Sequence, residues 1–370
     1  MQPHEFRRLN AGWASAPDRF CISFDEEDID DPFSIILSYD GRFPQPWSRT
    51  EVPRLIRSIT GFGSDETGDP LYAAMSDEGD VYMVRVGGTT HEKIPGAGIY
   101  SPDAADRGAV FQILVHQGQL CVVGDRDQVY LQEGDDTWRF LGRKGIAGPD
   151  TLGFLSRGGV SAGSGGLLCF GMAVHPTVDG SPEIETAIDE ALARQDYDEY
   201  ARLEDEIAAL TPPDEAQTHL WQDGTWARLP MPRDVALRNG FAERADKLWL
   251  VGLEGAIFTG NPLDGFEDVS FAGDRDDLYA ITRFQNEMII ASGYALHRFD
   301  GHILSPMKPP LDPAINGGVP NPMALQTVGD TMFYFDYKHG VCRWDGTTWD
   351  WVDIPPELLE REFSGLPSKE

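Results

Sequence analysis

Short apolar runs alternate with glycine and aspartate turns along nearly the whole chain. One stretch contains strand-like runs at 110–115, 119–123 and 128–132, with a fourth at 136–141 after a turn. The same order recurs at 238–243, 247–251, 256–259 and 266–271. Runs of this length and composition predict β-strands. Each stretch therefore predicts a unit of four strands.

Each predicted unit contains a tight turn before its last strand, and the turns at 223–226 (DGTW) and 345–349 (DGTTW) are the clearest. The glycines that mark these turns are residues 41, 88, 134, 224, 265, 301 and 346, at intervals of 47, 46, 90, 41, 36 and 45. The long interval contains a helix-rich segment, 176–216, and removing its 41 residues leaves 49. Asp-Gly between alternating runs is a strong hairpin signal. The spacing predicts seven units.

Seven four-stranded units of about 45 residues favour an all-β fold, a seven-bladed β-propeller over residues 1–370, because a closed ring protects its sheet edges. Too few helices are predicted for a multidomain α/β protein. The D-G-x-x-W turns, with the preceding runs LWLVG at 248–252 and LCVVG at 120–124, resemble kelch-type and Asp-box-type propeller repeats. The resemblance implies an architecture and transfers no active site, because neither the Gly-Gly pair of kelch units nor a complete Asp-box is intact.

The segment 176–216 is predicted to be a helical insertion in the fourth blade. Ser181 and Pro182 suit an N-cap and a first helical residue, and the prolines at 212 and 213 predict the end of the helix. Apolar residues recur at intervals of three and four, at Tyr197, Tyr200, Leu203, Ile207 and Leu210. Such a stripe packs against its own protein or offers an amphipathic helix to a partner.

The chain carries 30 Lys and Arg against 61 Asp and Glu, a formal net charge of −31. This charge disfavours nucleic acid and anionic membranes and favours basic partners. The longest apolar run, 167–174, is far too short to span a bilayer, and no secretory signal is visible in residues 1–10. We therefore expect a monomeric protein that resides in the cytoplasm.

The cysteines, Cys21, Cys121, Cys169 and Cys342, lie far apart and form no C-x-x-C pair. This spacing predicts buried thiols, with no metal and no cofactor. Disulfides would become an alternative if a signal peptide had been removed.

The predicted loops are strongly acidic. In a blade with strands a to d, the b–c and d–a connections emerge on one face, and this face would collect 28 of the 61 acidic residues. Acidic loops also keep proteins soluble, and residues 25–31 lack the glycine and the spacing of a calcium loop. The candidate partner-binding residues are Asp25, Glu26, Glu27, Asp28, Asp30, Asp31, Tyr197, Glu199, Tyr200, Asp274, Asp276 and Asp277.

Sequence motifs for catalysis are lacking: there is no nucleophile elbow, zinc-binding helix, phosphate-binding loop or dinucleotide fingerprint. The histidines are scattered without fixed spacing, and we expect structural roles for them. Sialidase-like enzymes of the Asp-box class need an arginine cluster, a tyrosine and two acids at the channel. Four arginines could meet there, although we expect no catalytic role for them: Arg57, Arg157, Arg238 and Arg283.

These patterns favour a non-enzymatic propeller that binds a basic protein through an acidic face and the helical insertion. The most specific form of this hypothesis is an immunity protein that neutralises a cognate bacterial toxin. The alternative is a propeller hydrolase or lyase that acts on a glycan or small molecule in the central channel.

Overall fold

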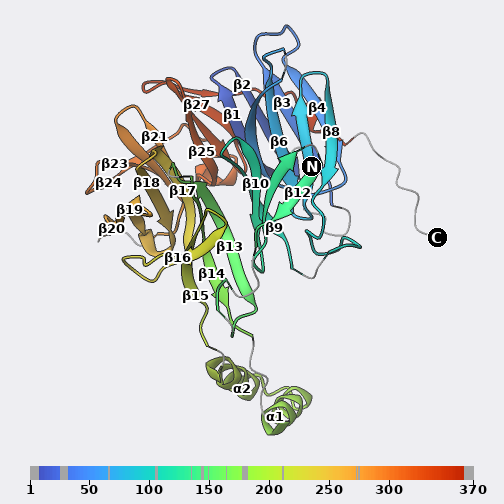
Figure 1. Ribbon diagram of the computed structural model, residues 1–370, viewed down its shortest axis with the longest axis vertical. Coiled ribbons are helices and arrows are strands. Elements are labelled where there is room, and N and C mark those ends of the chain that lie inside the picture. The colour runs from blue at the N-terminus through green and yellow to red at the C-terminus, as the bar shows by residue number, and fades with distance from the viewer. Residues whose placement is uncertain are drawn as a thin grey trace, which may run out of the picture.

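The protein is a seven-bladed β-propeller with a helical insertion in the fourth blade (Figure 1). The computed structural model describes residues 8–25, 32–65, 67–104, 107–134, 136–142, 146–148, 150–163, 165–176, 182–210, 212–271, 273 and 276–361. Glu26, Glu27, Asp28, Asp30, Asp31 and Asp274 of the predicted partner-binding set lie outside these residues.

Each blade is one antiparallel sheet of four consecutive strands, named a to d from the channel outward. Blade 1 comprises β1 (Arg8–Ala16), β2 (Arg19–Asp25), β3 (Ser34–Asp40) and β4 (Trp47–Val52). Blade 2 comprises β5 (Ile56–Ser64), β6 (Pro70–Ser76), β7 (Asp80–Arg85) and β8 (Gly88–Lys93). Blade 3 comprises β9 (Val110–His116), β10 (Gln119–Gly124), β11 (Val129–Gly134) and β12 (Thr137–Phe140).

Blade 4 comprises β13 (Gly153–Ser161), β14 (Leu167–Val174), β15 (Glu215–Gln222) and β16 (Thr225–Arg228). Blade 5 comprises β17 (Leu237–Arg244), β18 (Lys247–Gly252), β19 (Ile257–Asn261) and β20 (Gly265–Asp268). Blade 6 comprises β21 (Leu278–Phe284), β22 (Glu287–Ser292), β23 (Leu296–Phe299) and β24 (Leu304–Met307). Blade 7 comprises β25 (Pro322–Val328), β26 (Thr331–Asp336), β27 (Gly340–Trp344) and β28 (Trp349–Trp351). Short 3₁₀ turns occupy Leu253–Gly255, Asn316–Gly318 and Pro356–Leu359.

The seven marker glycines all lie at or beside the c–d turn of successive blades, which confirms the predicted number of blades. The turn at Asp223 and Gly224 has positive φ at both residues, 52° and 78°. These are the angles of a type I′ turn, whose twist matches that of the strands it joins. The Asp-Gly sequence therefore forms a hairpin turn here, as predicted.

The hydrophobic core is divided into seven buried clusters, one between each pair of neighbouring blades. Both surfaces of a blade therefore face apolar neighbours, which explains why the second strands are nearly continuous apolar runs. Residues Leu120 to Gly124 of β10 are all buried. The four cysteines are buried and unpaired, as predicted.

Among the described strands, blades 7 and 1 are each built from four consecutive strands, and the ring closes between them through side-chain contacts. The Gln326 amide accepts a hydrogen bond from the Ala14 N–H at 2.7 Å and donates one to the Ala14 carbonyl at 2.8 Å. Phe333 and Phe335 of blade 7 share a buried cluster with Phe20 of blade 1. The residues after β28 return to blade 1, where the Arg49 Nε donates to the Leu358 carbonyl at 2.9 Å.

The insertion is a pair of helices, α1 (Pro182–Ala193) and α2 (Tyr197–Leu210), between β14 and β15. They pack against each other through Ala191 and Leu203, both buried, and project away from the ring (Figure 1). α1 begins at Pro182 and α2 ends at Leu210, as predicted. We call α1 and α2 the arm, and the face formed by the b–c and d–a connections, from which the arm emerges, the insertion face. Within the described parts of the chain, neither helix is long and apolar enough to span a bilayer.

Candidate functional site: the channel mouth and the insertion face

A cavity of about 660 Å³ occupies the centre of the ring and is lined by residues from all seven a strands. Its volume lies within the range of small-ligand sites in proteins. Because every a strand begins at the insertion face, the first residues of these strands form the mouth of the channel on that side.

Every a strand carries a β-bulge near this mouth, where the pairing with the b strand shifts by one residue. A bulge leaves one residue unpaired and redirects its side chain, and bulges are common beside functional sites. All seven bulged residues line the cavity, and in blade order they are Asn10, Arg57, Phe111, Arg157, Arg238, Tyr279 and Met323. We call these seven residues the bulge ring.

The bulge ring is basic and aromatic on one side. Phe111, Arg157, Arg238 and Tyr279 come from four consecutive blades, 3 to 6, so that two guanidinium groups lie between two aromatic rings. The Arg157 guanidinium lies 4.8 Å from the centre of the Phe111 ring, a favourable cation–π distance. The mouth therefore carries cationic groups in a chain whose net charge is strongly negative.

Three aspartates lie at the same face as this ring and at equivalent positions, at or just after the end of strand b in blades 1 to 3: Asp25, Asp77 and Asp125. Burial raises the pKa of Asp25 to about 6, partly offset by the nearby Arg57 and Arg8. Burial likewise raises the pKa of Asp125 to about 6, partly offset by Arg157 and Arg126. The pKa of Asp77 is also raised by burial, although Arg57 Nη2 lies 3.5 Å from its Oδ2.

Several polar atoms at the mouth are buried without a hydrogen-bond partner among the described residues. They are the Nε atoms of Arg157 and Arg238 and the Oδ1 atoms of Asp25 and Asp125. Buried polar atoms of this kind are normally satisfied by protein, water or a ligand. Their concentration here distinguishes the mouth from the rest of the channel wall.

Replacing Asp125 with asparagine is expected to stabilise the protein at pH 8 by about 1 kcal/mol and to change little at pH 4. The folded-state pKa of about 6 exceeds the usual 3.8, so the folded protein loses stability relative to the unfolded chain as the pH rises from 4 to 6. Asparagine removes the buried charge, and the gain is smaller than the pKa shift alone implies because water reaches the half-buried group. Urea unfolding at both pH values measures the effect.

A matched control is Asp345→Asn in the c–d turn of blade 7. Hydrogen bonds from the backbone of Thr348 and from Thr347 lower the pKa of Asp345, so its asparagine variant should be slightly less stable than wild type at pH 8. Equal stability of Asp125→Asn and wild type at pH 8 would refute the claim that the buried, ionised carboxylate of Asp125 destabilises the folded protein.

Exposed tyrosines are concentrated on the insertion face. Four of the eleven tyrosines are exposed, namely Tyr100 at 86%, Tyr294 at 74%, Tyr197 at 67% and Tyr279 at 40%. Tyr100 lies in a d–a connection, Tyr294 in a b–c connection, Tyr197 on the arm and Tyr279 in the bulge ring. The opposite face has exposed aliphatic and phenylalanine side chains in its c–d turns, such as Leu263 and Phe43, but none of these four tyrosines.

Tyr100 is held in place by a buried carboxylate. Glu78 is 8% exposed and accepts hydrogen bonds from the backbone N–H groups of Ile99, Tyr100 and Ser101 at 3.0–3.2 Å. The Tyr100 side chain therefore projects from a fixed backbone. Glu78 is one of the acids expected on the acidic face, but here it has a structural role.

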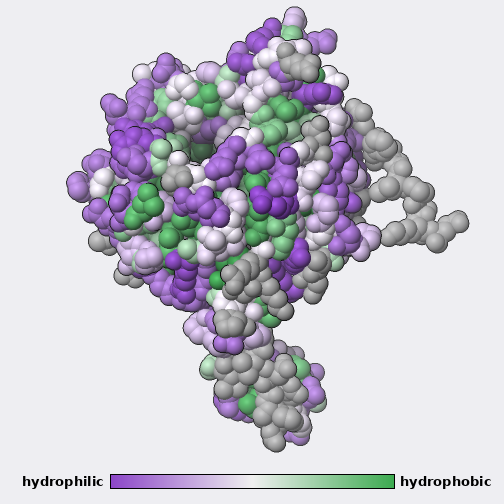
Figure 2. Space-filling model, in the orientation of Figure 1, coloured by the Kyte–Doolittle hydropathy of each residue, from purple (hydrophilic) through white to green (hydrophobic). Residues whose placement is uncertain are grey.

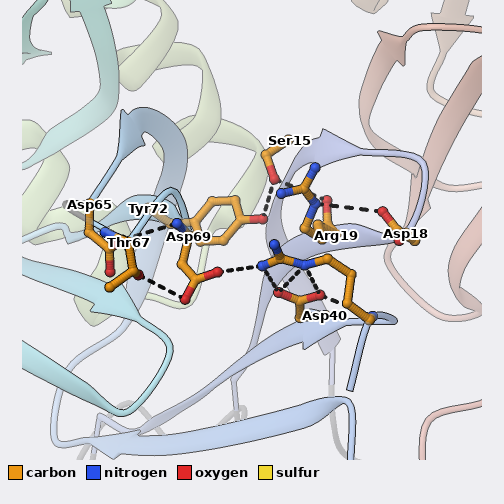
Figure 3. Close-up of polar contacts among 9 residues, drawn as sticks. Ser15, Asp18, Arg19, Asp40, Asp65, Thr67, Asp69 and Tyr72 are labelled. Carbon is orange, nitrogen blue, oxygen red and sulfur yellow. Dashed lines mark hydrogen bonds and ion pairs between the residues drawn. The ribbon is translucent and has the colours of Figure 1, made fainter. Parts of the chain in front are cut away.

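A second cavity, of about 420 Å³, lies between blades 1 and 2 at the opposite face and is lined by three prolines and by Tyr39, Phe43 and Tyr72. Figure 3 shows the polar network beside it, in which Ser15 hydrogen-bonds the Tyr72 hydroxyl at 2.7 Å and Thr67 bonds Asp65 and Asp69. Arg42 joins this network by pairing with both Asp40 and Asp69. These polar groups satisfy one another and brace the two blades.

The described members of the predicted partner-binding set occupy three places on the insertion face. Asp25 is half-buried at the channel mouth, and Asp276 and Asp277 precede β21, where Asp277 accepts a hydrogen bond from the Glu254 N–H at 3.0 Å. On the arm, Tyr197 is exposed and Tyr200 is half-buried. Glu199 is also half-buried and pairs with Arg202 at 2.9 Å.

Three of the four arginines expected near the channel belong to the bulge ring. The exception is Arg283, which lies at the other end of β21 and pairs with Glu243. His116, His219 and His339 make local contacts with Ser161, Gln217 and Asp336 and do not line the channel. Among the described residues, no three or more His, Cys, Asp or Glu are grouped so that they could hold a metal ion.

Solved structures similar to this chain are propellers. No family model and no curated sequence matches it. YCF48 bound to D1 peptide is similar over 92% of this chain and 93% of that chain, with 12% identity and a TM-score of 0.53. The WD40 propeller domain of Doa1 is similar over 92% of this chain and 93% of that chain, with 9% identity and a TM-score of 0.51. Sqt1 from Chaetomium thermophilum is similar over 92% of this chain and 81% of that chain, with 11% identity and a TM-score of 0.54.

These similarities show the fold. At such low identities they carry no residue of this chain into a known site. The functional argument therefore depends on the side chains of the channel mouth and the insertion face.

Proposed function

We propose that this propeller binds a partner protein through its insertion face. The observation that carries the proposal is the location of all four exposed tyrosines on that face or on the arm. Tyrosine is enriched at protein interfaces because its large ring is ordered at low entropic cost and its hydroxyl still makes hydrogen bonds. Hydrophilic residues cover most of the visible surface of the propeller body in Figure 2.

The arm supplies the electrostatic part of the proposal. Residues 182–210 contain ten acidic side chains and two arginines. Both arginines pair with acids of the arm, Arg194 with Glu190 and Arg202 with Glu199 and Glu206. The remaining negative charge favours a basic partner and speeds its association.

Neutralisation of a basic bacterial toxin is the most specific form of the proposal. An immunity protein must cover its toxin, and the insertion face, with a projecting arm and a tyrosine-rich surface, suits such a role. YCF48, a propeller of similar fold at 12% identity, has been solved bound to a peptide. That similarity supports the suitability of the architecture for binding a polypeptide.

The test compares wild type with a variant in which residues 181–210 are replaced by a short Gly-Ser linker. Immobilised protein captures partners from a lysate of the native host, and the captured protein is then produced separately for titration. We expect the linker variant to fold normally and to bind at least about 100-fold more weakly, and wild-type binding to weaken steeply with salt.

Leu263→Ser, in an exposed turn of the opposite face, is the control and should bind like wild type. Unchanged binding by the linker variant, or loss of binding in Leu263→Ser, would contradict the proposal. A captured partner that is basic and arrests growth when expressed alone supports the toxin form.

A second candidate function is a hydrolase or lyase that acts on a glycan or small molecule in the channel. It is favoured by Arg157, Arg238 and Tyr279, which line one cavity, and by Asp125 beside Arg157, whose pKa is raised to about 6. Arginines hold anionic substrates, and a carboxyl group of this pKa transfers protons near neutral pH. Release of 4-methylumbelliferone from uronic acid glycosides tests it. Turnover that is lost in Asp125→Asn supports the enzyme, and turnover that survives in this variant opposes it.

A further inference from the structure

We propose that the channel mouth binds a carboxylate group borne on an apolar or aromatic residue, between Phe111, Arg157, Arg238 and Tyr279. This inference goes beyond partner binding by the insertion face and does not depend on it. It rests on the bulges, the cavity and the charges of the mouth.

The bulges supply the geometry. Arg157 and Arg238 occupy the same structural position in adjacent blades, and in each the strand pairing skips one residue, between Ser156 and Gly158 and between Leu237 and Asn239. Both side chains line the cavity of about 660 Å³. Two guanidinium groups therefore flank one space from neighbouring sheets.

The neighbouring charges favour Arg157 and Arg238 over Arg57 as the arginines that bind the carboxylate. Arg57 already pairs with Asp77 at 3.5 Å, and it also lies close enough to Asp25 to lower its pKa. Arg157 is near one aspartate, Asp125. Within the part of the chain that the structure describes, no carboxylate lies within ion-pair distance of Arg238, so its charge is available to a ligand.

The two guanidinium groups that line the cavity point to a ligand oxygen. The Nε atoms of Arg157 and Arg238 are buried and have no hydrogen-bond acceptor among the described residues. A guanidinium offers its N–H groups as a planar fork that matches the two oxygens of a carboxylate. A carboxylate in the cavity would accept hydrogen bonds from the guanidinium N–H groups of Arg157 and Arg238 that reach it and would balance their charge.

The aromatic residues define what accompanies the carboxylate. Phe111 and Tyr279 border the two arginines on either side, and Tyr279 remains exposed toward the mouth. Their faces suit an apolar or aromatic group attached to the anion. Two sources carry this chemistry, a free carboxylic acid and the C-terminal residue of a polypeptide.

The experiment is a calorimetric titration of the full chain with four probes. They are the peptide acetyl-Ala-Ala-Phe with a free C-terminus, the same peptide as its C-terminal amide, phenylacetate and inorganic phosphate. We expect saturable binding at one site by at least one of the two carboxylates, and at least about tenfold weaker binding by the amide and by phosphate. Tighter binding of the peptide acid than of phenylacetate identifies a polypeptide terminus, and the reverse order identifies a free acid.

Substitutions of the two arginines test whether they form the carboxylate site. Arg157→Gln and Arg238→Gln should each weaken binding of the preferred carboxylate at least about tenfold. Arg238→Lys keeps the charge but loses the planar fork, so its affinity should be intermediate. Arg283→Gln, on β21 but at the opposite end and paired with Glu243, is the matched control and should bind like wild type. Thermal unfolding verifies that each variant is folded.

Three results would overturn the proposal. They are no saturable binding of either carboxylate, binding of the amide or phosphate as tight as that of the acids, and wild-type affinity in the double variant Arg157→Gln, Arg238→Gln. Its failure is distinguishable from failure of partner binding, because that function is tested separately with the arm and the tyrosines.

Discussion

Replacing Asp336 with alanine is expected to lower the free energy of unfolding by about 3–5 kcal/mol. Asp336 is fully buried at the end of β26. Its Oδ1 accepts hydrogen bonds from the backbone of Lys338 and His339 and from the His339 ring, and its Oδ2 accepts from the Asn321 N–H and the Tyr334 hydroxyl. Alanine would leave these donors buried without an acceptor.

The network around Asp336 joins three elements of blade 7, which is why the effect should be large. The carboxylate ties strand b to the b–c turn and to the connection from blade 6. It also raises the pKa of Tyr334, together with burial, which is the larger cause. The stability of Asp336→Asn should be intermediate. Its amide keeps one acceptor oxygen, but an NH2 group replaces the other oxygen and faces N–H or O–H donors.

The control is Asp350→Ala in the same blade, where an exposed carboxylate pairs with Arg343. Exposed ion pairs contribute little, so this variant should lose less than about 1 kcal/mol. Urea unfolding monitored by tryptophan fluorescence measures both variants. Similar stabilities of Asp336→Ala and Asp350→Ala would contradict the role given to the buried network.

Replacing Tyr100 or Tyr294 with alanine is expected to weaken partner binding by about 2 kcal/mol each, or roughly 30-fold. Both rings are among the most exposed apolar groups of the protein, so their removal should leave stability within about 0.5 kcal/mol of wild type. Glu78 still holds the backbone of residue 100 in Tyr100→Ala, because its bonds there are to backbone N–H groups. A titration with the purified partner measures the loss.

Leu263→Ala is the matched control for the tyrosines, since Leu263 is equally exposed on the opposite face. We expect it to bind the partner with wild-type affinity. If both tyrosine variants bound like wild type, the insertion face would not be the interface.

Much of the fold could be predicted from local turn chemistry. Asp223 and Gly224 adopt positive φ, as an Asp-Gly turn requires, and the recurrence of such turns indicates the number of blades. The start of α1 at Pro182 follows from the fixed φ of proline. These features depend on a few neighbouring residues, so one sequence is enough to find them.

The bulge ring could not be predicted in the same way. Its residues range from asparagine to methionine, because a bulge is a property of strand pairing and imposes no residue type. One signal was available: aligning the seven a strands places Arg57, Arg157 and Arg238 at the same position, each just before a small or polar residue, Ser58, Gly158 and Asn239. The sequence already indicated that these three arginines could meet at the channel, and the alignment would have separated Arg283 from them.

The burial of individual side chains also distinguishes residues whose roles could not be told apart from the sequence. Asp25 and Glu78 look alike in sequence as loop acids, yet Asp25 is half-buried beside arginines and Glu78 bonds three backbone N–H groups. The exposed tyrosines resemble the seven others in sequence, and it is their exposure at the insertion face and the arm that separates them. Whether Asp25, Asp276 and Asp277 contact a partner stays a prediction.

The most direct test of partner binding by the insertion face is amide hydrogen exchange of the protein with and without its bound partner. We predict slower exchange on binding in peptides that cover 94–104, 190–203 and 276–295, which include all four exposed tyrosines. The c–d turns at 41–46, 223–225 and 262–265, on the opposite face, should exchange as in the free protein. Protection confined to those turns, with the tyrosine-bearing peptides unchanged, would contradict the account.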